Sequence, residues 1–481
     1  MPIDADIGDY ITEDLIQSVS VQSRQEEIFS MSDSKLDGFQ PGSPGDVYQK
    51  TLLPHQSEMA HNHLAFIQAR HHALQDASTV IEMQMQIAEK MLGKESGGET
   101  PLLREKTPCK PAASENLKTD SPMFNKDQLE EFASGNVELC FGEDYAVYRG
   151  RRLPRIPNGD LLLMSRILDI TGTRGVFDKE PRLVAEYDVP VDAWFYADDL
   201  NQNMAPYAVL MEIALQPCGF LSAYLGSTLA TPHVDYYFRN LDGRGQFLND
   251  SDVRGKTICN RVKLLSSISL RGIIMQRYQF ALECEGISFY EGEATFGYFT
   301  ADALAAQVGL DKGQSVSPNF RQYSQDMIAL PVPYKDQLHG LDYCAFSPKG
   351  GRYGKGYTYG ESNIDPDAWF FHRHFHQDPV MPGSLGIDMI YQALELSLRT
   401  IWESGGRSGQ SLKLFYGSKH ELSWAYRGQV RPNNKHIAIA LHIKELSTNT
   451  HGTIAVIEAS LWVDDLRIYE VKNLEVRLGP T

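Results

Sequence analysis

The sequence predicts an α+β fold in which two antiparallel sheets each wrap around one central helix, preceded by a polar N-terminal tether. Three observations support this prediction: an internal repeat, one long apolar helix in each copy of the repeat, and long alternating strands after each helix. Together they indicate two duplicated units, each built around its own helix.

Length, composition and charge limit the classes of protein. The 481 residues, 42% of them hydrophobic, are enough for two or three domains. A formal net charge of −17 without a basic cluster disfavours binding to nucleic acid, whose phosphates are also negative. The apolar runs are too short to span a bilayer, and the acidic N-terminus lacks the order of a signal peptide. Six scattered cysteines without a CxxC pair are typical of the reduced cytoplasm, where we expect the protein.

Residues 1–122 are predicted to be a tether that contains one helix. The first part, to about His55, is polar and punctuated by Pro and Gly, which favours disorder. Residues 57–92 contain no Gly or Pro and approximate an apolar stripe at helical spacing. An isolated helix needs a partner to be stable, so we expect this one to dock on another domain or to self-associate into a dimer. Residues 93–122 are rich in Pro, Lys, Glu and Ser, as linkers are.

The rest of the chain contains a repeat. The tetrapeptide DAWF stands at residues 192–195 and again at 367–370, which is 175 positions later. Arg-Gly pairs at 254–255 and 427–428 are 173 positions apart. Two matches with nearly the same offset indicate duplicated units of about 170 residues.

We place the first unit at 123–312 and the second at 313–481. Each unit is predicted to contain strands, then one buried helix, expected at 206–226 and at 382–402, and then several long strands that alternate apolar and polar residues. A helix that is apolar on nearly every face is best buried by a sheet curled around it. This is the arrangement of the hot-dog fold, so the chain is predicted to be a double hot dog.

The second unit carries the long motif DAWFFHRHFHQDPVMPGSLGIDM, from Asp367 to Met389. This motif and the later GSKHELSWAYRGQVRP resemble the bacterial β-hydroxydecanoyl-acyl-carrier-protein dehydratase (FabA-like) family. The first unit resembles the same family more weakly, and the pair is similar to the dehydratase region of polyunsaturated-fatty-acid synthases, which are polyketide-synthase-like proteins. The resemblance implies dehydration of 3-hydroxyacyl thioesters to 2-enoyl thioesters, with an acyl carrier protein and other synthase domains as partners. The substrate would be carried on phosphopantetheine, and no other cofactor is implied.

Dehydration needs a base for the α-proton, an acid for the departing hydroxyl, and hydrogen-bond donors for the thioester oxygen. His374 occupies the family's histidine position, and an imidazole suits the base because it titrates near neutral pH. A structural role at a strand end is the alternative for His374. Gly383, at the start of the second helix, would supply a backbone N–H for the thioester oxygen, while a glycine there also serves close packing.

The acid has two candidates. Asp388 occupies the family's aspartate position, but the family's sites straddle a two-fold interface, so His374 should face the helix of the first unit. When the prolines that open the two helices are aligned, Glu212 falls opposite Asp388, and PYAVLMEIALQ resembles the helix of the related dehydratase that uses glutamate. A carboxyl buried in this apolar helix is costly without a role, although a solvated or N–H-bonded glutamate is the alternative. We pair His374 with Glu212 and keep Asp388 as the second candidate.

Three features leave alternatives open. The mirror site, which would use Asp388, has no histidine in the corresponding segment YADDLNQNM at 196–204, so we expect it to be inactive. Ser384 stands where the decanoyl-specific enzyme has cysteine, which leaves double-bond isomerisation open. His372, His374 and His376 would point one way on a strand and could bind a metal, but the DPVMPG context explains them without one.

Two other functions compete with dehydration. A hot-dog thioesterase would hydrolyse the same acyl-carrier thioesters, but it would usually activate water with a carboxylate and would not need the histidine motif. A catalytically silent scaffold module is the second alternative, because the first unit looks degenerate. The second unit, however, retains every position of the motif.

Overall fold

The computed structural model describes residues 121–196, 205–270, 272–318, 326–332, 338, 340–407 and 409–480. The predicted helix at 57–92, and all of the predicted tether before residue 121, lie outside the described residues. Within the described ranges, no helix combines the length and the apolar character that crossing a membrane requires. The five cysteines described, Cys140, Cys218, Cys259, Cys284 and Cys344, are free thiols.

Along the chain of the first unit, the central helix stands between two groups of strands. The helices are α4 (Lys126–Ala133), α5 (Val137–Phe141), the 3-10 turns η3 (Glu143–Tyr148), η4 (Gly159–Leu161) and η5 (Trp194–Tyr196), and the long α6 (Tyr207–Tyr224). The strands are β1 (Arg166–Thr171), β2 (Arg182–Asp188), β3 (Tyr237–Phe247), β4 (Thr257–Leu270), β5 (Ile273–Cys284) and β6 (Ile287–Phe299). Every residue of α6 from Tyr207 to Ser222 is buried, as predicted for a helix that is apolar all round.

The second unit repeats this order. After α7 (Ala301–Ala305) come β7 (Ile328–Ala329), β8 (Tyr343–Ser347), β9 (Tyr357–Asn363), α9 (Trp369–Arg373) and the long α10 (Gly383–Ser404). The late strands are β10 (Leu412–Tyr416), β11 (Leu422–Tyr426), β12 (His436–Asn449), β13 (Gly452–Val463) and β14 (Leu466–Pro480). Both central helices start at the residue after the proline that the sequence marked as their beginning, a position that the fixed φ of proline suits, although α6 also holds Pro217 in its interior.

The strands join into one antiparallel sheet. Its order is β1-β2-β4-β5-β6-β3-β11-β14-β13-β12-β9-β8-β7, with β10 also paired to β14. The two halves meet at β3 and β11, where residues 242–245 pair with residues 422–425. The sequence predicted a sheet for each unit but not this junction, because a pairing between strands so far apart in the chain leaves no local pattern.

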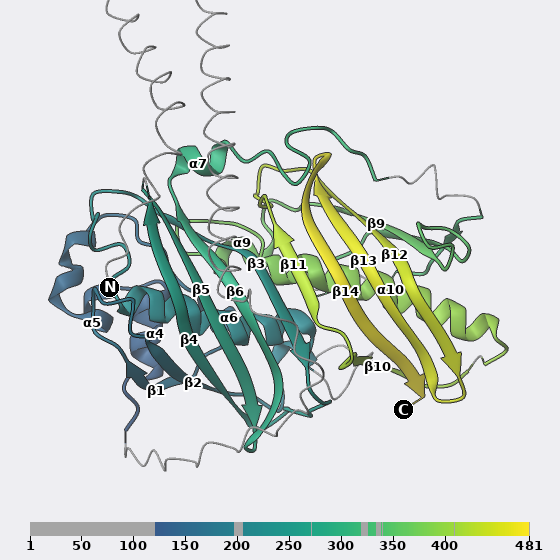
Figure 1. The fold of residues 1–481 in the computed structure, drawn as a ribbon, viewed down its shortest axis with the longest axis horizontal. Coiled ribbons are helices and arrows are strands. Elements are labelled where there is room, and N and C mark those ends of the chain that lie inside the picture. Colours follow the sequence, from purple (N-terminus) through teal and green to yellow (C-terminus); the bar gives the residue numbers. More distant parts are fainter. Residues whose placement is uncertain are drawn as a thin grey trace, which may run out of the picture. The chain divides into compact units, whose positions relative to one another are not determined.

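The two central helices lie on the same side of the sheet (Figure 1) and contact each other. Helix α6 packs on β2, β4 and β5, and α10 packs on β9, β12, β13 and β14. The repeated DAWF segments also meet, since the rings of Trp194 and Trp369 pack edge to face with centroids 5.3 Å apart. Equivalent residues touch in this way at a two-fold axis, so the two units form a pseudo-dimer within one chain.

The prediction of a double hot-dog fold is thereby confirmed. The unit boundary at residues 312 and 313 falls in the connection between α7 and β7 and stays a prediction.

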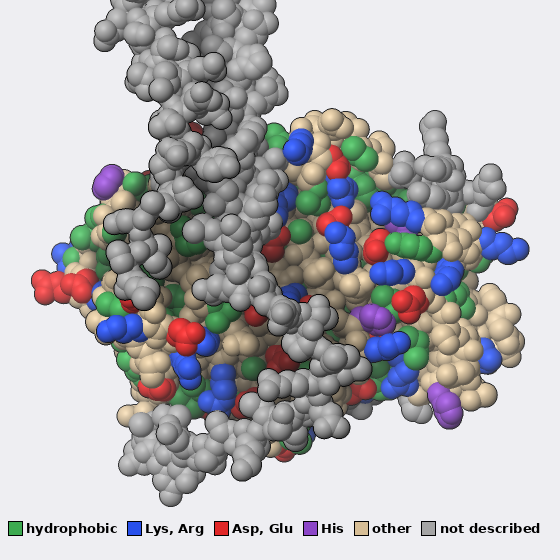
Figure 2. Space-filling model, viewed as in Figure 1, with side chains coloured by type: hydrophobic (Ala, Val, Ile, Leu, Met, Phe, Trp, Pro, Cys, Tyr) green, Lys and Arg blue, Asp and Glu red, His purple; other side chains and the backbone are tan. Residues whose placement is uncertain are grey.

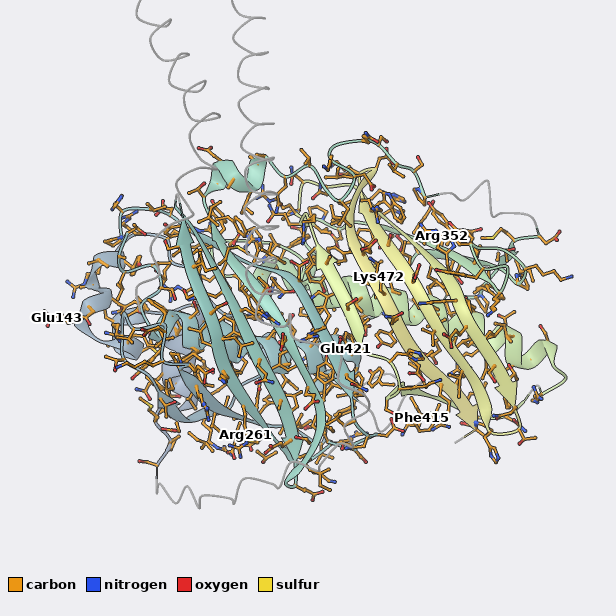
Figure 3. All side chains as sticks on the ribbon, viewed as in Figure 1. Glu143, Arg261, Arg352, Phe415, Glu421 and Lys472 are labelled. Atoms are coloured by element: carbon orange, nitrogen blue, oxygen red, sulfur yellow. The ribbon has the colours of Figure 1, made fainter. Side chains whose placement is uncertain are left out.

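Acidic and basic side chains are interspersed with other residues on the visible part of the sheet's outer face (Figure 2). Lys472 on β14 and Arg261 on β4 mark its two halves in Figure 3. Lys472 Nζ lies 2.7 Å from Glu470, and Arg261 Nε lies 3.1 Å from Glu283. Such exposed pairs add little stability each, so the fold depends on the apolar layer between the sheet and its helices.

Candidate active site

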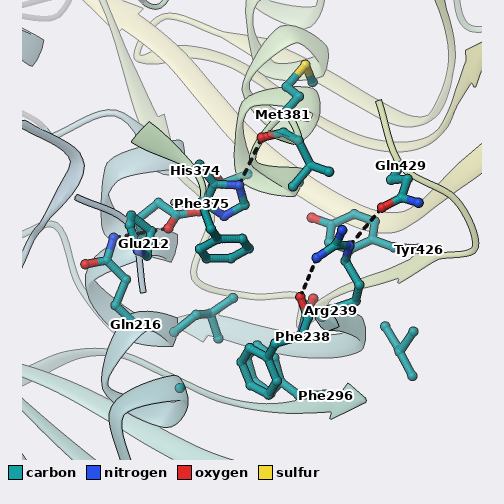
Figure 4. A pocket seen from close by; sticks show the side chains of 18 of the residues that line it. Glu212, Gln216, Phe238, Arg239, Phe296, His374, Phe375, Met381, Tyr426 and Gln429 are labelled. Carbon is teal, nitrogen blue, oxygen red and sulfur yellow. Dashed lines mark hydrogen bonds between the residues drawn. The ribbon is translucent and has the colours of Figure 1, made fainter. Parts of the chain in front are cut away.

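A cavity of about 100 Å³ lies where the two units meet. The first unit contributes residues of α6, β3 and β6, and the second contributes the turn between α9 and α10 and the end of β11. Three of the four predicted site residues, His374, Glu212 and Gly383, line this cavity, and Asp388 does not. Figure 4 shows His374 and Glu212 approaching each other from different parts of the chain.

His374 caps the C-terminal end of α9 and is buried, with 9% of its surface exposed. Its Nδ1 lies 3.1 Å from the carbonyl oxygen of Val380, so Nδ1–H donates to that oxygen and Nε2 keeps its lone pair. The backbone N–H of Val380 donates in return to the carbonyl of His374 at 3.0 Å, which fixes the turn. Burial lowers the pKa of His374, against the opposing effect of the nearby Glu212 carboxyl. The imidazole is therefore neutral near pH 7, which is the form a base needs.

Glu212 reaches the cavity from α6 of the first unit. Its Oε1 accepts a hydrogen bond from the hydroxyl of Ser384 at 2.8 Å, and its Oε2 accepts one from the amide of Gln216 at 3.2 Å. Gln216 is itself held by the backbone before β1: its Oε1 accepts from Leu163 N at 2.9 Å, and its Nε2 donates to Leu161 O at 2.8 Å. The carboxyl is therefore oriented by both units.

Sequence reasoning missed Gln216 as a site residue. The signal was present, since EIALQ and DMIYQ both place a glutamine four residues after the carboxyl. Residues four apart lie on one face of a helix, so such a glutamine can hold the carboxyl that precedes it.

Asp388 has an equivalent glutamine partner in the mirror position. Gln392 donates to Asp388 Oδ2 at 3.0 Å and to the carbonyl of Leu338 at 2.6 Å, and its Oε1 accepts from Gly340 N at 3.2 Å. These bonds repeat those that Gln216 makes around Glu212. The structure therefore relates Glu212 and Asp388 by the pseudo-two-fold, and only Glu212 faces the cavity that holds His374.

Aromatic side chains fill the mirror position of the cavity. Tyr207 is the first residue of α6, as Gly383 is the first of α10. Its buried ring contacts four others, those of Phe247, Tyr290, Tyr391 and Tyr416. A separate cavity of about 10 Å³, lined by Phe247 and Tyr416 but not by Asp388, lies beside this cluster. Segment 197–204, where the missing histidine would stand, lies outside the described residues. A filled mirror site gives a steric reason for the inactivity that its sequence predicts.

The structure gives a packing reason for Gly383, and its role toward the thioester oxygen stays a prediction. A Cβ atom there would lie 2.6 Å from the ring of Tyr426, so the packing requires glycine. As the first residue of α10 its N–H has no partner within the helix, and no hydrogen bond is found for it among the described residues. The positive end of the helix dipole adds to the attraction for an oxyanion.

An ion cluster ties the histidine turn to the first unit. Arg239 on β3 binds Asp378 with two hydrogen bonds of 2.7 and 2.9 Å, and Arg152 lies 2.8 Å from the same carboxyl. Burial alone would raise the pKa of Asp378, but the two arginines outweigh it and the pKa is lowered. The charge of this buried carboxylate is therefore compensated from the other unit. The sequence did not reveal these arginines, because they lie far from the motif.

The HxHxH segment is not a strand, contrary to the geometry considered for a metal site. His372 lies in helix α9, and His374 begins the turn that follows it. The described part of the chain holds no group of His, Cys, Asp and Glu side chains arranged to bind a metal ion.

The chain is similar to proteins of known family. Residues 336–472 match the model of the FabA-like domain family. The chain is 32% identical over 383 residues, 73% of its length, to a curated relative from Thraustochytrium sp., one of the subunits of a polyunsaturated fatty acid synthase. It spans only 26% of that relative's length. The resemblance that the DAWFFHRHFHQDPVMPG motif predicted is thereby confirmed.

Two solved structures are among those that the chain is similar to. One is an acyl-ACP thioesterase of Bacteroides thetaiotaomicron, with a TM-score of 0.36, 9% identity, and coverage of 61% of this chain and 97% of that one. The other is a bifunctional dehydratase-cyclase domain in ambruticin biosynthesis, with a TM-score of 0.35, 10% identity, and coverage of 65% and 94%. Structural similarity at about 10% identity does not distinguish dehydration from thioester hydrolysis.

Proposed function

We propose that this chain dehydrates 3-hydroxyacyl thioesters, carried on the phosphopantetheine of an acyl carrier protein, to 2-enoyl thioesters. The observation that carries the proposal is the presence of His374 and Glu212 in one cavity, from different hot dogs, beside the N–H of Gly383. The FabA-like match over residues 336–472 supports the reaction type. The similarity to part of a polyunsaturated fatty acid synthase supports a place in fatty-acid synthesis, with other synthase domains as neighbours.

Each proposed residue has one task in the reaction. The N–H of Gly383 donates to the thioester oxygen and stabilises the negative charge that develops there. His374 Nε2 removes the α-proton, the electron pair of that C–H bond becomes the Cα=Cβ double bond, and the Cβ–O bond breaks. Glu212, protonated at this step, gives its proton to the departing hydroxyl, which leaves as water. Return of the proton from His374 to Glu212 restores both groups, so the steps need no cofactor beyond the carrier's arm.

The bonds around the two side chains suit these tasks. The carbonyl of Val380 holds the imidazole with Nε2 directed away from it, as a base must be held. Ser384 and Gln216 hold the two oxygens of Glu212, so the carboxyl is oriented before substrate arrives. Such preorganisation lowers the cost of reaching the transition state.

Product analysis tests the proposal. The full chain is incubated with a 3-hydroxyacyl thioester on acyl carrier protein, and the products are separated by mass spectrometry, with His374→Ala as the control. An enoyl thioester that forms with the wild type and not with the control supports dehydration. Free acid would mean a thioesterase, and unchanged substrate with both proteins would favour a scaffold module. A 3-enoyl product beside the 2-enoyl one would add isomerisation, which Ser384 in place of cysteine leaves open.

A further inference from the structure

We propose that the acyl chain of the substrate lies along helix α6 toward Gly219, and that Gly219, Phe238 and Phe296 set the longest chain the site accepts. The inference rests on the proposed dehydratase function and adds to it a part of the cavity that selects the substrate. It concerns chain length and not the chemistry at His374 and Glu212.

The cavity follows one face of α6 away from the reactive carboxyl. Glu212, Leu215 and Gly219 all line it, and they stand at positions i, i+3 and i+7 of the helix. Seven residues of helix advance by about 10 Å along its axis. The lining beyond Glu212 includes the apolar side chains of Ile156, Leu215, Phe238 and Phe296, as an alkyl chain requires.

The wall opposite Gly219 is rigid. The rings of Phe238 and Phe296 stack with centroids 4.9 Å apart and an interplanar angle of 3° (Figure 4). Phe238 also contacts Tyr298 at 4.7 Å, and Phe296 contacts Tyr278 edge to face at 5.9 Å. The hydroxyl of Tyr278 donates to buried Gln276 at 2.8 Å, which holds this second layer of rings. A chain that is too long therefore meets a packed layer that cannot easily move.

Gly219 keeps the end of the cavity open. A Cβ atom there would lie 3.4 Å from the Phe238 ring and 3.5 Å from Ile156 Cγ2, which is ordinary contact. An alanine would therefore fit, but the next carbons of a larger side chain would enter the cavity. Glycine inside a helix is disfavoured relative to alanine, and a need for space at this point accounts for it.

A different part of the lining suits the carrier's arm. Gln307 and Gln429 line the cavity, and the amide N–H groups of their side chains have no partner among the described residues. Pantetheine contains amide carbonyls that can accept from such groups. Leu241, also in the lining, packs with Phe299 and Leu304 in a cluster separate from the main core that holds Phe238. The cavity thus reaches both faces of β3, so the arm and the acyl chain can occupy different ends.

The test measures kcat/KM for 3-hydroxyacyl pantetheine thioesters of increasing chain length. Gly219→Val should lower the value for the longest chain that the wild type accepts by about 10-fold or more, and leave the shortest within about 2-fold, because each excluded methylene loses its burial. Phe238→Ala should extend the range to longer chains. Gly219→Ala, which the geometry tolerates, gives a smaller effect in the same direction if the valine variant does not fold.

Phe247→Ala is the matched control. Phe247 lies on the same strand, is as buried as Phe238, and stacks on Tyr416 at 4.5 Å in the filled mirror position. Its replacement should reduce stability in a similar way but leave the order of preference among chain lengths unchanged. An unchanged chain-length profile in both Gly219→Val and Phe238→Ala would overturn the inference, as would an equal change in Phe247→Ala.

Calorimetric binding of saturated acyl pantetheine thioesters separates this inference from the proposed function. If the wild type forms no enoyl product but binding depends on chain length and shifts in Gly219→Val, the acyl site stands and the dehydratase function fails. If the wild type forms enoyl product and neither binding nor turnover responds to Gly219→Val and Phe238→Ala, the dehydratase stands and the acyl site fails.

Discussion

The hydroxyl of Ser384 donates a 2.8 Å hydrogen bond to Oε1 of Glu212, so the first turn of the helix in one hot dog holds the carboxyl supplied by the other. The same first turn begins with Gly383, which lines the cavity together with His374. The pseudo-dimer interface and the candidate active site are therefore one structure. Substitution of Glu212 should therefore lower turnover much more than substitution of Asp388.

Replacing His374 should remove the base. We expect His374→Ala to lower kcat/KM for a 3-hydroxyacyl thioester by about 10²–10⁴-fold, the usual range for a general base. Circular dichroism should show an unchanged fold, because the imidazole makes one side-chain hydrogen bond, to Val380. Activity within a few-fold of the wild type would remove His374 from the reaction.

The two carboxyls should respond differently to isosteric substitution. Glu212→Gln should abolish dehydration, since the amide cannot donate the proton and Glu212 lies in the cavity with His374. Asp388→Asn is the matched variant in the mirror position and should retain most of the turnover, because Asp388 does not line the cavity that holds His374. The reverse result, a lethal Asp388→Asn beside a mild Glu212→Gln, would place the acid in the same hot dog as the base.

Gln216 should act as a positioning residue. Gln216→Ala leaves Oε2 of Glu212 and the N–H of Leu163 without their partner, so kcat should fall by about 10–100-fold while KM changes little. Gln392→Ala removes the equivalent glutamine from Asp388 and should leave kcat unchanged, although both variants lose a buried hydrogen-bond network. Equal losses of kcat in the two variants would mean that Gln216 serves stability alone.

The pH dependence should follow the histidine. Burial lowers the pKa of His374 from its ordinary 6.5, and the base is active only when unprotonated. Plotted against pH, kcat/KM should therefore have an acidic limb below pH 6.5, where the pH drops through the lowered pKa of His374. NMR titration of the wild type should give His374 a pKa below 6.5. A midpoint above pH 7 for the acidic limb would contradict the assignment.

Removal of residues 1–122 should leave a folded, active dehydratase. The deletion keeps Phe124, whose backbone pairs with Ile167 and whose side chain is buried in the core. Turnover with a pantetheine substrate should match the full chain, and size-exclusion chromatography would show whether the deletion changes the oligomeric state. Loss of folding would mean that the predicted helix at 57–92 belongs to the core.

Several features could be predicted from the sequence because they depend on residues near one another in the chain. The helices expected at 206–226 and 382–402 formed as α6 and α10, since apolar character and an opening proline are local signals. The motif around His374 led to the candidate base and to Gly383 in the same way. The repeat of DAWF predicted the pseudo-dimer, because a duplicated unit repeats its motifs at a nearly constant spacing along the chain.

Only the tertiary structure decided which groups meet. Three contacts join residues that are far apart in the chain. They are the hydrogen bonds of Gln216 to Leu161 and Leu163, the ion pair of Arg239 with Asp378, and the pairing of β3 with β11. The aromatic cluster that fills the mirror site draws its rings from α6, α10 and three separate strands, which no periodicity reveals. The sequence by itself predicted the two units, the candidate side chains and the pairing of His374 with Glu212. That Glu212 and His374 line one cavity, and which contacts hold them there, depended on packing between surfaces that are remote along the chain and adjacent in space.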